Sequence, residues 1–298
     1  MRQMKRSSLR ETFLLCASRA AAVAVCAALF ALMAFLVHRG LPALGKALFF
    51  GSTPPLDALL GRRPVWDGLW PATAGTLCLI ALTMLFALLP GIGSGIFLAC
   101  YASPRQKYWL GLAVDLLAGI PSIVMGLFGF VLIVFLRRTL LPGGTTCLLL
   151  AAFCLALLVL PALVVGTRNA LESLPERLAI TAAALGFTHD ATVFRLLVPS
   201  AARGILGGVI LAMGRAAEDT AVIMLTGVVA NAGLPAGLFV KFEALPFRIY
   251  YTAAQYADQE ELATGFGAAL VLLTLSGGLL LCAWLLQKGL ERRWRGVR

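Results

Sequence analysis

Long apolar runs separated by short polar stretches dominate the pattern along this chain. A helix of about 20 apolar residues crosses a hydrocarbon layer about 30 Å thick, and six runs are long enough to do so. The runs lie at residues 13–37, 71–99, 110–136, 145–166, 205–230 and 263–286. Because alternation with a period of two is absent, strands are not favoured. The pattern therefore predicts an all-α polytopic membrane protein with about six transmembrane helices.

Composition supports this prediction and excludes other classes of protein. Of the 298 residues, 60% are hydrophobic and 13% are charged, whereas soluble domains are about 25% charged. An ordinary soluble enzyme and a disordered chain are therefore excluded. The net charge of +11 would suggest nucleic acid in a soluble protein. Here the basic residues flank the apolar runs, so we expect contact with membrane lipid and no nucleic-acid partner.

The basic residues also predict orientation. With the N-terminus inside, fifteen Lys and Arg residues fall in inner segments and eight in outer segments. This bias predicts that both termini are cytoplasmic. The apolar stretch 20–37 is too long for the core of a usual signal peptide, so it predicts a retained anchor.

Two regions follow from the spacing of the runs. Residues 1–70 are expected to hold a cytoplasmic tail, the first transmembrane helix and an outer loop rich in Gly and Pro. Residues 71–298 are expected to form the transmembrane core. Breaks in the second and third runs are predicted at Pro90–Gly93 and Gly119–Ser122.

Small residues recur with a spacing of four in two runs, which is typical of closely packed membrane helices. The rows are Ala118, Ser122 and Gly126 in the third run, and Gly204, Gly208, Ala212 and Ala216 in the fifth.

The inner segment 167–203 carries signals for two short helices. Ser173 and Glu176 fit a capping box, which predicts that a helix starts at Ser173. Gly186 is a natural left-handed cap for the C-terminus of the same helix. A second helix is predicted from His189 to about Leu197, ending by Pro199. Two interpretations stay open: a compact two-helix knob on the cytoplasmic face, or a helix lying on the membrane interface.

Charged residues inside the fifth run are the main candidate for function. Arg215, Glu218 and Asp219 have the spacing that shares one helix face. A charge near the bilayer centre costs about 2.5–3.5 kcal/mol on insertion scales. Pairing Arg215 with one acid would reduce that cost, yet two acids are present. A transport pathway is favoured over a purely structural ion pair.

The sequence has few residues in the patterns that bind metals or nucleotides. The seven cysteines form no C-x-x-C pair, and the two histidines are far apart, so no metal site and no bound cofactor are predicted. The stretch Gly40–Ala47 nearly spells a P-loop but has Ala47 where the hydroxyl should be. We therefore expect no ATPase or other enzyme activity in this chain.

Residues 116–129, LLAGIPSIVMGLFG, and residues 160–226 resemble the permease subunits of bacterial phosphate ABC transporters. The PstA type is the nearer match and the PstC type the second, within the MetI-like permease family, and weaker similarity runs from about Pro71 to the C-terminus. The resemblance implies a six-span core with a coupling loop at about 168–203, in the bacterial inner membrane. It also implies three kinds of partner: separate ABC ATPase subunits, a second, PstC-like permease subunit and a periplasmic phosphate-binding protein.

Two motifs of that family transfer onto this sequence. The coupling motif implies contact with the ATPase through Ala182, Ala183, Gly186, Val198 and Pro199. Its leading glutamate is replaced at about Ile180, so one polar contact is lost.

The membrane motif, roughly R-A-x-G-E-T, implies a substrate pathway at Arg215, Glu218, Asp219 and Thr220. Asp219 stands at the glutamate of the motif, and Glu218 replaces its glycine. An added carboxylate would repel a phosphate dianion unless Arg215 or a partner subunit neutralises it. Phosphate is the predicted substrate. Molybdate, sulfate or phosphonate transport is one alternative, and a membrane scaffold or sensor that transports nothing is another.

Overall fold

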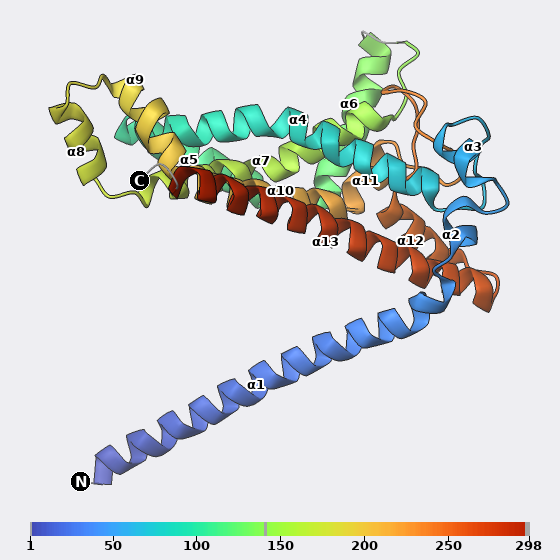
Figure 1. The fold of residues 1–298 in the computed structure, drawn as a ribbon, viewed down its shortest axis with the longest axis horizontal. Coiled ribbons are helices and arrows are strands. Elements are labelled where there is room, and N and C mark those ends of the chain that lie inside the picture. Colours follow the sequence, from blue (N-terminus) through green and yellow to red (C-terminus); the bar gives the residue numbers. More distant parts are fainter. Residues whose placement is uncertain (1, 140–141, 296–298) are drawn as a thin grey trace.

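The structure, a computed structural model, describes residues 2–139 and 142–295, and these residues are almost entirely helical (Figure 1). The elements are α1 (Arg2–Gly40), η1 (Leu41–Ala43), α2 (Lys46–Phe50), α3 (Pro55–Leu59), α4 (Trp70–Cys100), α5 (Pro104–Ala118), α6 (Ser122–Thr139), α7 (Leu148–Glu172), α8 (Arg177–Ala184), α9 (His189–Thr192), a π-helical turn (Val193–Leu197), α10 (Val198–Glu218), α11 (Ala221–Thr226), α12 (Leu245–Gln255) and α13 (Gln259–Arg295).

Six helical segments of the described residues are long and apolar enough to cross a membrane. They lie at residues 11–43, 70–100, 122–139, 148–172, 189–218 and 259–289. The all-α class and the six spans are therefore confirmed. The orientation prediction counted eight basic residues whose side chains the structure does not describe. They are Arg2, Lys5, Arg6, Arg10, Arg292, Arg293, Arg295 and Arg298.

Helix α7 is the most buried of the six spans, and α4 and α10 pack on it. Glycines allow the close approach of α4: a Cβ on Gly91 would lie 2.7 Å from Cβ of Leu163, and one on Gly95 would lie 2.5 Å from Cβ of Thr167. Without side chains at these positions the backbones come close enough for dense packing, which is what holds membrane helices together.

The row of small residues in α10 packs against the same helix. A Cβ on Gly204 would lie 2.5 Å from Cβ of Ala170, and Gly208 faces Gly166. Further along the row, Ala212 and Ala216 are fully buried. The packing role predicted for this row is confirmed, and α13 packs on another part of α10, where Gly214 lies against Leu280.

The predicted break at Pro121 is confirmed, whereas the one at Pro90 is wrong. Proline lacks an N–H group and disfavours helical geometry in the residue before it, so α5 ends at Ala118 and α6 begins at Ser122. The third span is thus shorter than predicted, and Ala118 and Ser122 do not share a helix with a single row of small residues. In α4, Pro90 lies inside a continuous helix that its packing against α7 maintains.

The fifth span also differs from the prediction, which ran from 205 to 230. It starts earlier, at residue 189, and ends at Glu218. Asp219 is extended, with φ −72° and ψ 116°, and a separate helix, α11, follows. The long helix therefore stops about twelve residues before the end of the apolar run.

The end of the bundle near α2, α3 and α12 is closed by loops. The end of α11 and the loop that follows it cap the N-terminus of α7: Cys147, Leu148 and Leu149 donate their backbone N–H groups to the carbonyls of Thr226, Val240 and Leu238. These donors have no partner inside a helix, so the loop satisfies them.

A buried carboxylate orders the same loop. The side chain of Glu243 is 4% exposed and accepts a 2.9 Å hydrogen bond from the N–H of Gly233. Burial raises the pKa of Glu243 above its ordinary value. The N–H groups of Gly233 and Ala232 and the nearby charge of Arg248 act in the opposite direction but do not cancel this increase.

Helix α1 leaves the bundle at a wide angle (Figure 1). The C-terminal end of α1 contacts the first part of α13, where Phe35 makes an edge contact with Phe266 and Gly40 lies against Leu270. None of its most apolar stretch is buried. A long apolar helix with this exposure needs lipid or another protein around it.

Candidate functional site

The predicted pathway residues lie at the junction of α10 and α11. Arg215 and Glu218 are on α10, whereas Asp219 and Thr220 form the two-residue link to α11. The structure therefore keeps Arg215 and Glu218 on one helix, but the prediction that Asp219 shares that helix face is wrong. The side chain of Asp219 caps α11 instead, because its Oδ1 accepts a 2.9 Å hydrogen bond from the N–H of Val222.

The side chains of Arg215 and Glu218 are both exposed on α10. Among the described residues, ion pairs join Asp57 to Arg63 and Glu172 to both Lys107 and Arg168, and Arg215 belongs to none of them. The pairing of Arg215 with one acid, which the spacing allows, is thus absent from the ion pairs of the described residues.

The junction is not at the end of the bundle. Helix α11 continues past it, and the carbonyl of Thr226 at the end of α11 accepts a hydrogen bond from the N–H of Cys147, the residue before α7. Helix α11 is clamped by glycines of α6: a Cβ on Gly126 would lie 2.9 Å from the carbonyl of Ala221, and one on Gly129 would meet Thr226. Arg215 and Glu218 are therefore charged residues that lie between the ends of the bundle.

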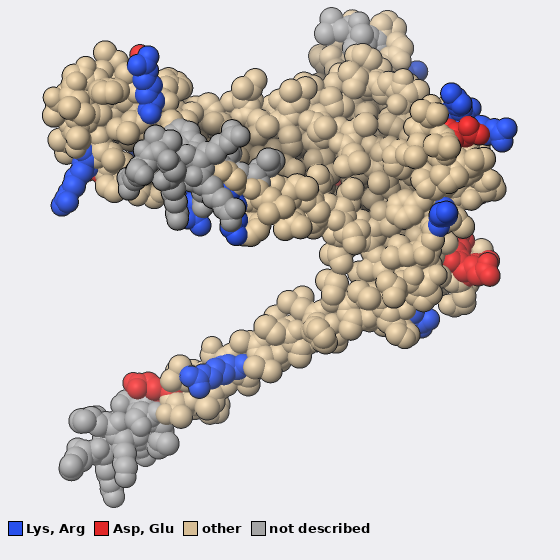
Figure 2. Space-filling model, viewed as in Figure 1, with Lys and Arg blue, Asp and Glu red and all other residues tan. Residues whose placement is uncertain are grey.

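Charge is distributed accordingly over the surface that Figure 2 shows, where Lys and Arg gather towards the ends of the molecule and the middle is largely uncharged. An uncharged band between charged ends is typical of a protein that spans a bilayer.

Residues 177–197, which we call the two-helix knob, project from the end of the bundle opposite α3 (Figure 1). Helix α8 begins at Arg177 and is capped by Gly186, whose φ is +80°. The left-handed cap predicted at Gly186 is confirmed. The capping box predicted at Ser173 is wrong: Ser173 ends α7, and its hydroxyl donates to the carbonyl of Ala170.

The second helix of the knob does not end at Pro199 as predicted. It runs from α9 through the π-helical turn into α10 without interruption. The wider turn at Val193–Leu197 precedes Pro199 and gives its ring room, since a proline clashes with the carbonyl four residues earlier in a regular helix. The hydroxyl of Ser200 donates to the carbonyl of Leu196 at 2.6 Å, which satisfies one acceptor of this turn.

The five predicted coupling residues are divided between two places. Ala182, Ala183 and Gly186 lie on the knob, with Ala182 buried and the other two exposed. Val198 and Pro199 are the first residues of α10, below the knob and partly buried.

The knob exposes apolar side chains beyond the bundle. Leu185 is 72% exposed, Ile180 is 65% exposed and Phe194 is 59% exposed. A cavity of about 530 Å³ between α8 and the π-helical turn is lined by Leu178 and Leu185 among others. An apolar patch at the polar end of a membrane protein is typical of a surface that binds another protein.

A cluster that the sequence did not reveal joins the knob to α4. The hydroxyl of Tyr101 donates to Oδ1 of Asp190 at 2.7 Å, and Nε2 of His189 lies 3.1 Å from the carbonyl of Cys100. These partners are 89 positions apart. Only the T-x-x-A start of α9, where the Thr188 hydroxyl accepts from the N–H of Ala191, could have marked a helix end here.

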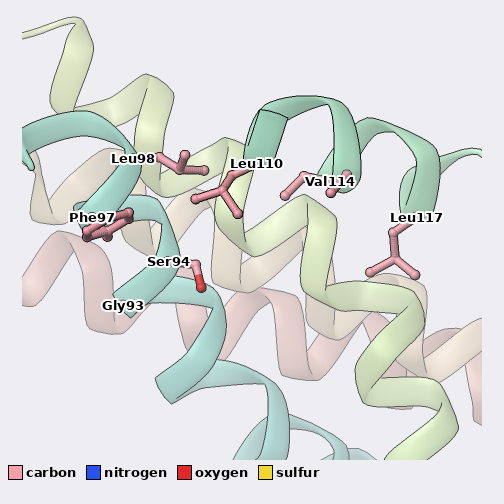
Figure 3. Close-up of a pocket in the computed structure, with 8 residues that line it drawn as sticks. Gly93, Ser94, Phe97, Leu98, Leu110, Val114 and Leu117 are labelled. Atoms are coloured by element: carbon pink, nitrogen blue, oxygen red, sulfur yellow. The ribbon is translucent and has the colours of Figure 1, made fainter. Parts of the chain in front are cut away.

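Helix α5 is fixed at the same end of the bundle. It begins with the capping box of Ser103 and Gln106, with Pro104 in its first turn. Lys107 pairs with Glu172 at the end of α7. Figure 3 shows the apolar cavity of about 390 Å³ between α4 and α5, which Phe97, Leu110 and Leu117 line.

No group of three or more His, Cys, Asp or Glu side chains that could hold a metal ion occurs in the described part of the chain. The site is therefore built from a helix junction with an exposed arginine and from a projecting knob.

Residues 91–296 match the family of the binding-protein-dependent transport system inner membrane component. The chain belongs to this family. It is 32% identical over 240 residues to the phosphate transport system permease protein PstA of Haemophilus influenzae, with 80% of each chain covered. It is 29% identical over 279 residues to the probable ABC transporter permease protein YqgI of Bacillus subtilis, with 88% of this chain and 89% of the relative covered.

The fold agrees with membership of this family of permeases. A chain of the methionine ABC transporter MetNI in an inward-facing conformation matches with a TM-score of 0.58 and 18% identity, over 80% of this chain and 99% of that one. The protein is thus a multi-pass permease subunit of an ABC importer. Permeases of this family act with ATPase subunits and a second permease subunit, so ATP hydrolysis lies on separate chains.

Proposed function

We propose that this permease subunit carries inorganic phosphate across the bacterial inner membrane. The relatives named PstA and PstC support this choice of substrate, the PstC of Mesorhizobium japonicum being 35% identical over 178 residues. The observation that carries the proposal is Arg215, an exposed cation inside a membrane span that belongs to none of the ion pairs of the described residues.

An uncompensated arginine is costly in a membrane unless something anionic reaches it. A guanidinium also presents planar donors that match the oxygens of a phosphate. In this proposal Arg215 meets the anion during transport, and Glu218 keeps the site from holding it tightly by repulsion. Asp219 and Thr220 set the bend between α10 and α11 and so determine where Arg215 points.

The partners follow from the two ends of the molecule. The exposed apolar residues of the two-helix knob, including Ala183 and Gly186, are the proposed contact with the ATPase, whereas Val198 and Pro199 connect the knob to α10. The proposed second permease, PstC-like, covers the exposed face of α10, and a periplasmic phosphate-binding protein docks at the opposite end. This arrangement requires the knob and both termini to be cytoplasmic, with residues 71–298 as the core.

Glu218 is the observation that favours a second candidate. A carboxylate beside Arg215 reduces the attraction for a dianion, so an oxyanion of different charge or size, such as molybdate, sulfate or phosphonate, is the alternative substrate.

The test is uptake of radiolabelled phosphate by cells that lack the chain and by cells that carry it, with molybdate and sulfate as competitors. Arg215→Gln should abolish uptake at unchanged protein amount. Arg137→Gln is the matched control, because it removes an exposed charge from the end of α6. Phosphate uptake at the parental rate in Arg215→Gln would remove Arg215 from the pathway. Uptake that responds to the chain for sulfate or molybdate alone would replace phosphate as the substrate.

A further inference from the structure

Three side chains join the end of α4 to the start of α9, and we call Tyr101, His189 and Asp190 the α4–α9 latch. The hydroxyl of Tyr101 donates to the Asp190 carboxylate at 2.7 Å. The rings of Tyr101 and His189 meet edge to face, with centroids 4.9 Å apart and planes at 87°. His189 Nε2 also lies 3.1 Å from the Cys100 carbonyl, one of the acceptors that a helix end leaves open.

The donor of the latch, the Tyr101 hydroxyl, is available over the physiological pH range. The hydrogen bond to Asp190 raises the pKa of Tyr101 to about 12, so its hydroxyl stays protonated and continues to donate. A hydrogen bond to a charged acceptor is about twice as strong as one between neutral groups.

The latch matters because of how the knob is attached elsewhere. On one side the chain enters through the turn at 173–176 after α7. On the other side it leaves through the π-helical turn at Val193–Leu197, where the regular hydrogen-bond pattern of the helix is loosened. Leu197, the last residue of the knob, also packs in an apolar cluster with Ile96 and Cys100 of α4. The latch adds a polar connection from α9, on the other side of the π-helical turn, so a push on the knob need not be taken up by bending of this turn.

We propose that the α4–α9 latch passes movement of the two-helix knob directly to α4, with Tyr101 as a positioning residue for coupling. This inference rests on the proposed function, because it assumes that an ATPase moves the knob. Helix α4 is a suitable receiver, since Gly91 and Gly95 hold it tightly against α7. A displacement at Tyr101 is thereby shared with α4 and α7 rather than absorbed by the π-helical turn.

The first experiment uses the complex of this chain with its ATPase and permease partners in proteoliposomes, and it measures phosphate transported and ATP hydrolysed. Tyr101→Phe keeps the ring contact to His189 and removes the donor. Asp190→Ala removes the acceptor, whereas Asp190→Asn keeps an oxygen that can accept. Tyr108→Phe is the matched control, because Tyr108 is exposed on α5 and its ring contacts Trp109.

Loss of the bond should lower the phosphate transported per ATP by about fivefold in Tyr101→Phe and Asp190→Ala, as expected for one net hydrogen bond. Tyr108→Phe should keep the parental ratio, and Asp190→Asn, which replaces the charged acceptor by a neutral one, should lie between the parent and Asp190→Ala. The double variant Tyr101→Phe/Asp190→Ala should be no worse than either single variant, since Tyr101→Phe and Asp190→Ala remove the same bond. A parental ratio in Tyr101→Phe overturns the proposal, as does an equal loss of transport and hydrolysis, which indicates a structural role.

A second measurement separates this inference from the choice of substrate. Cys100 is partly exposed beside the latch, Cys147 and Cys154 are buried, and the remaining cysteines can be replaced by alanine. Maleimide labelling of Cys100 should change on adding ATP in the parent, and Tyr101→Phe should lose this change. If the parent transports no phosphate, the proposed function fails while this labelling still tests the latch. Equal labelling changes in the parent and in Tyr101→Phe refute the latch with any substrate.

Discussion

Gly186 provides the sharpest test of the knob as a rigid unit. The N–H of Gly186 donates to the carbonyl of Ala183 at 3.0 Å, and the N–H of Phe187 donates to the carbonyl of Ala182 at 3.0 Å. This pair of bonds is the Schellman motif, which requires a left-handed residue at the position of Gly186, where φ is +80°. The turn between α8 and α9 therefore depends on one residue that can adopt positive φ.

The cost of a side chain there comes from the backbone alone. A Cβ on Gly186 would meet no atom within 4 Å, so no substitution causes a clash with neighbouring residues at this atom. Left-handed geometry costs an L-residue about 1–2 kcal/mol, and a β-branched residue is at the upper end or beyond. Asparagine tolerates this geometry and is the second choice at such caps. We expect the strain to follow the order Asn, Ala, Val.

The assay is binding of purified ATPase to permease in detergent, together with the amount of permease in the membrane. Gly186→Val should reach the membrane normally and bind the ATPase about tenfold to thirtyfold more weakly, which corresponds to about 1.4–2 kcal/mol. Gly186→Asn should stay within about threefold of the parent. Gly45→Val is the matched control, because Gly45 also has open space but an extended backbone with φ −162°. Equal binding by the Val and Asn variants of Gly186 would refute the reasoning.

Three further predictions test the packing, the buried acid and the orientation. Gly208→Leu should lower the stability of the detergent-solubilised protein by about 1–3 kcal/mol in thermal unfolding, because Gly208 faces Gly166, whereas Gly207→Leu on the open side should not. Since the raised pKa of Glu243 means that the folded chain holds this proton more tightly than the unfolded chain, stability should increase as pH falls through that pKa towards the ordinary glutamate value. Melting between about pH 8 and about pH 5 measures this slope, and Glu243→Gln should flatten it. A reporter fused after Arg298 should be active only if it functions in the cytoplasm, and periplasmic activity would contradict the proposed orientation.

The apolar runs predicted the six spans because each span must satisfy its backbone within itself, which leaves a strong compositional signal. Residues 70–100 and 148–172 lie close to the second and fourth predicted runs. Packing rows were predictable only within one helix. The α10 row packs against a neighbouring helix as predicted, and that helix is α7. Ala118 and Ser122 instead lie on either side of the break before α6.

Local signals failed where a competing pattern was nearby. Ser173-Leu174-Pro175-Glu176 has the letters of a capping box, but α7 continues to Glu172 and Ser173 donates back to its last turn. The real capping box lies at Ser103 and Gln106, with the same pattern of residue types. A motif of four residues cannot by itself show which of two helices it terminates or begins.

The contacts between the knob and α4 were beyond the reach of the sequence for a different reason. Tyr101 and Asp190 are each ordinary polar residues near a helix end, and their pairing depends on how α4 and α10 pack on α7. Nothing in the spacing of either residue encodes a partner 89 positions away.

Asp219 shows how the same residue can change its role between the sequence and the structure. Read as part of one long helix, it is a second acid on the helix face that carries Arg215 and Glu218, and either acid could pair with the guanidinium. In the structure the helix ends one residue earlier, and the carboxylate is occupied by the N–H of Val222. A short acid stem reaches its own following backbone readily, which favours a cap over a distant ion pair. The bend therefore takes Asp219 away from Arg215 and leaves the guanidinium exposed. If Arg215 serves an anion, the residue that makes it available is Asp219, and Asp219→Asn, which retains an oxygen that can cap α11, should preserve far more transport than Asp219→Leu, which cannot.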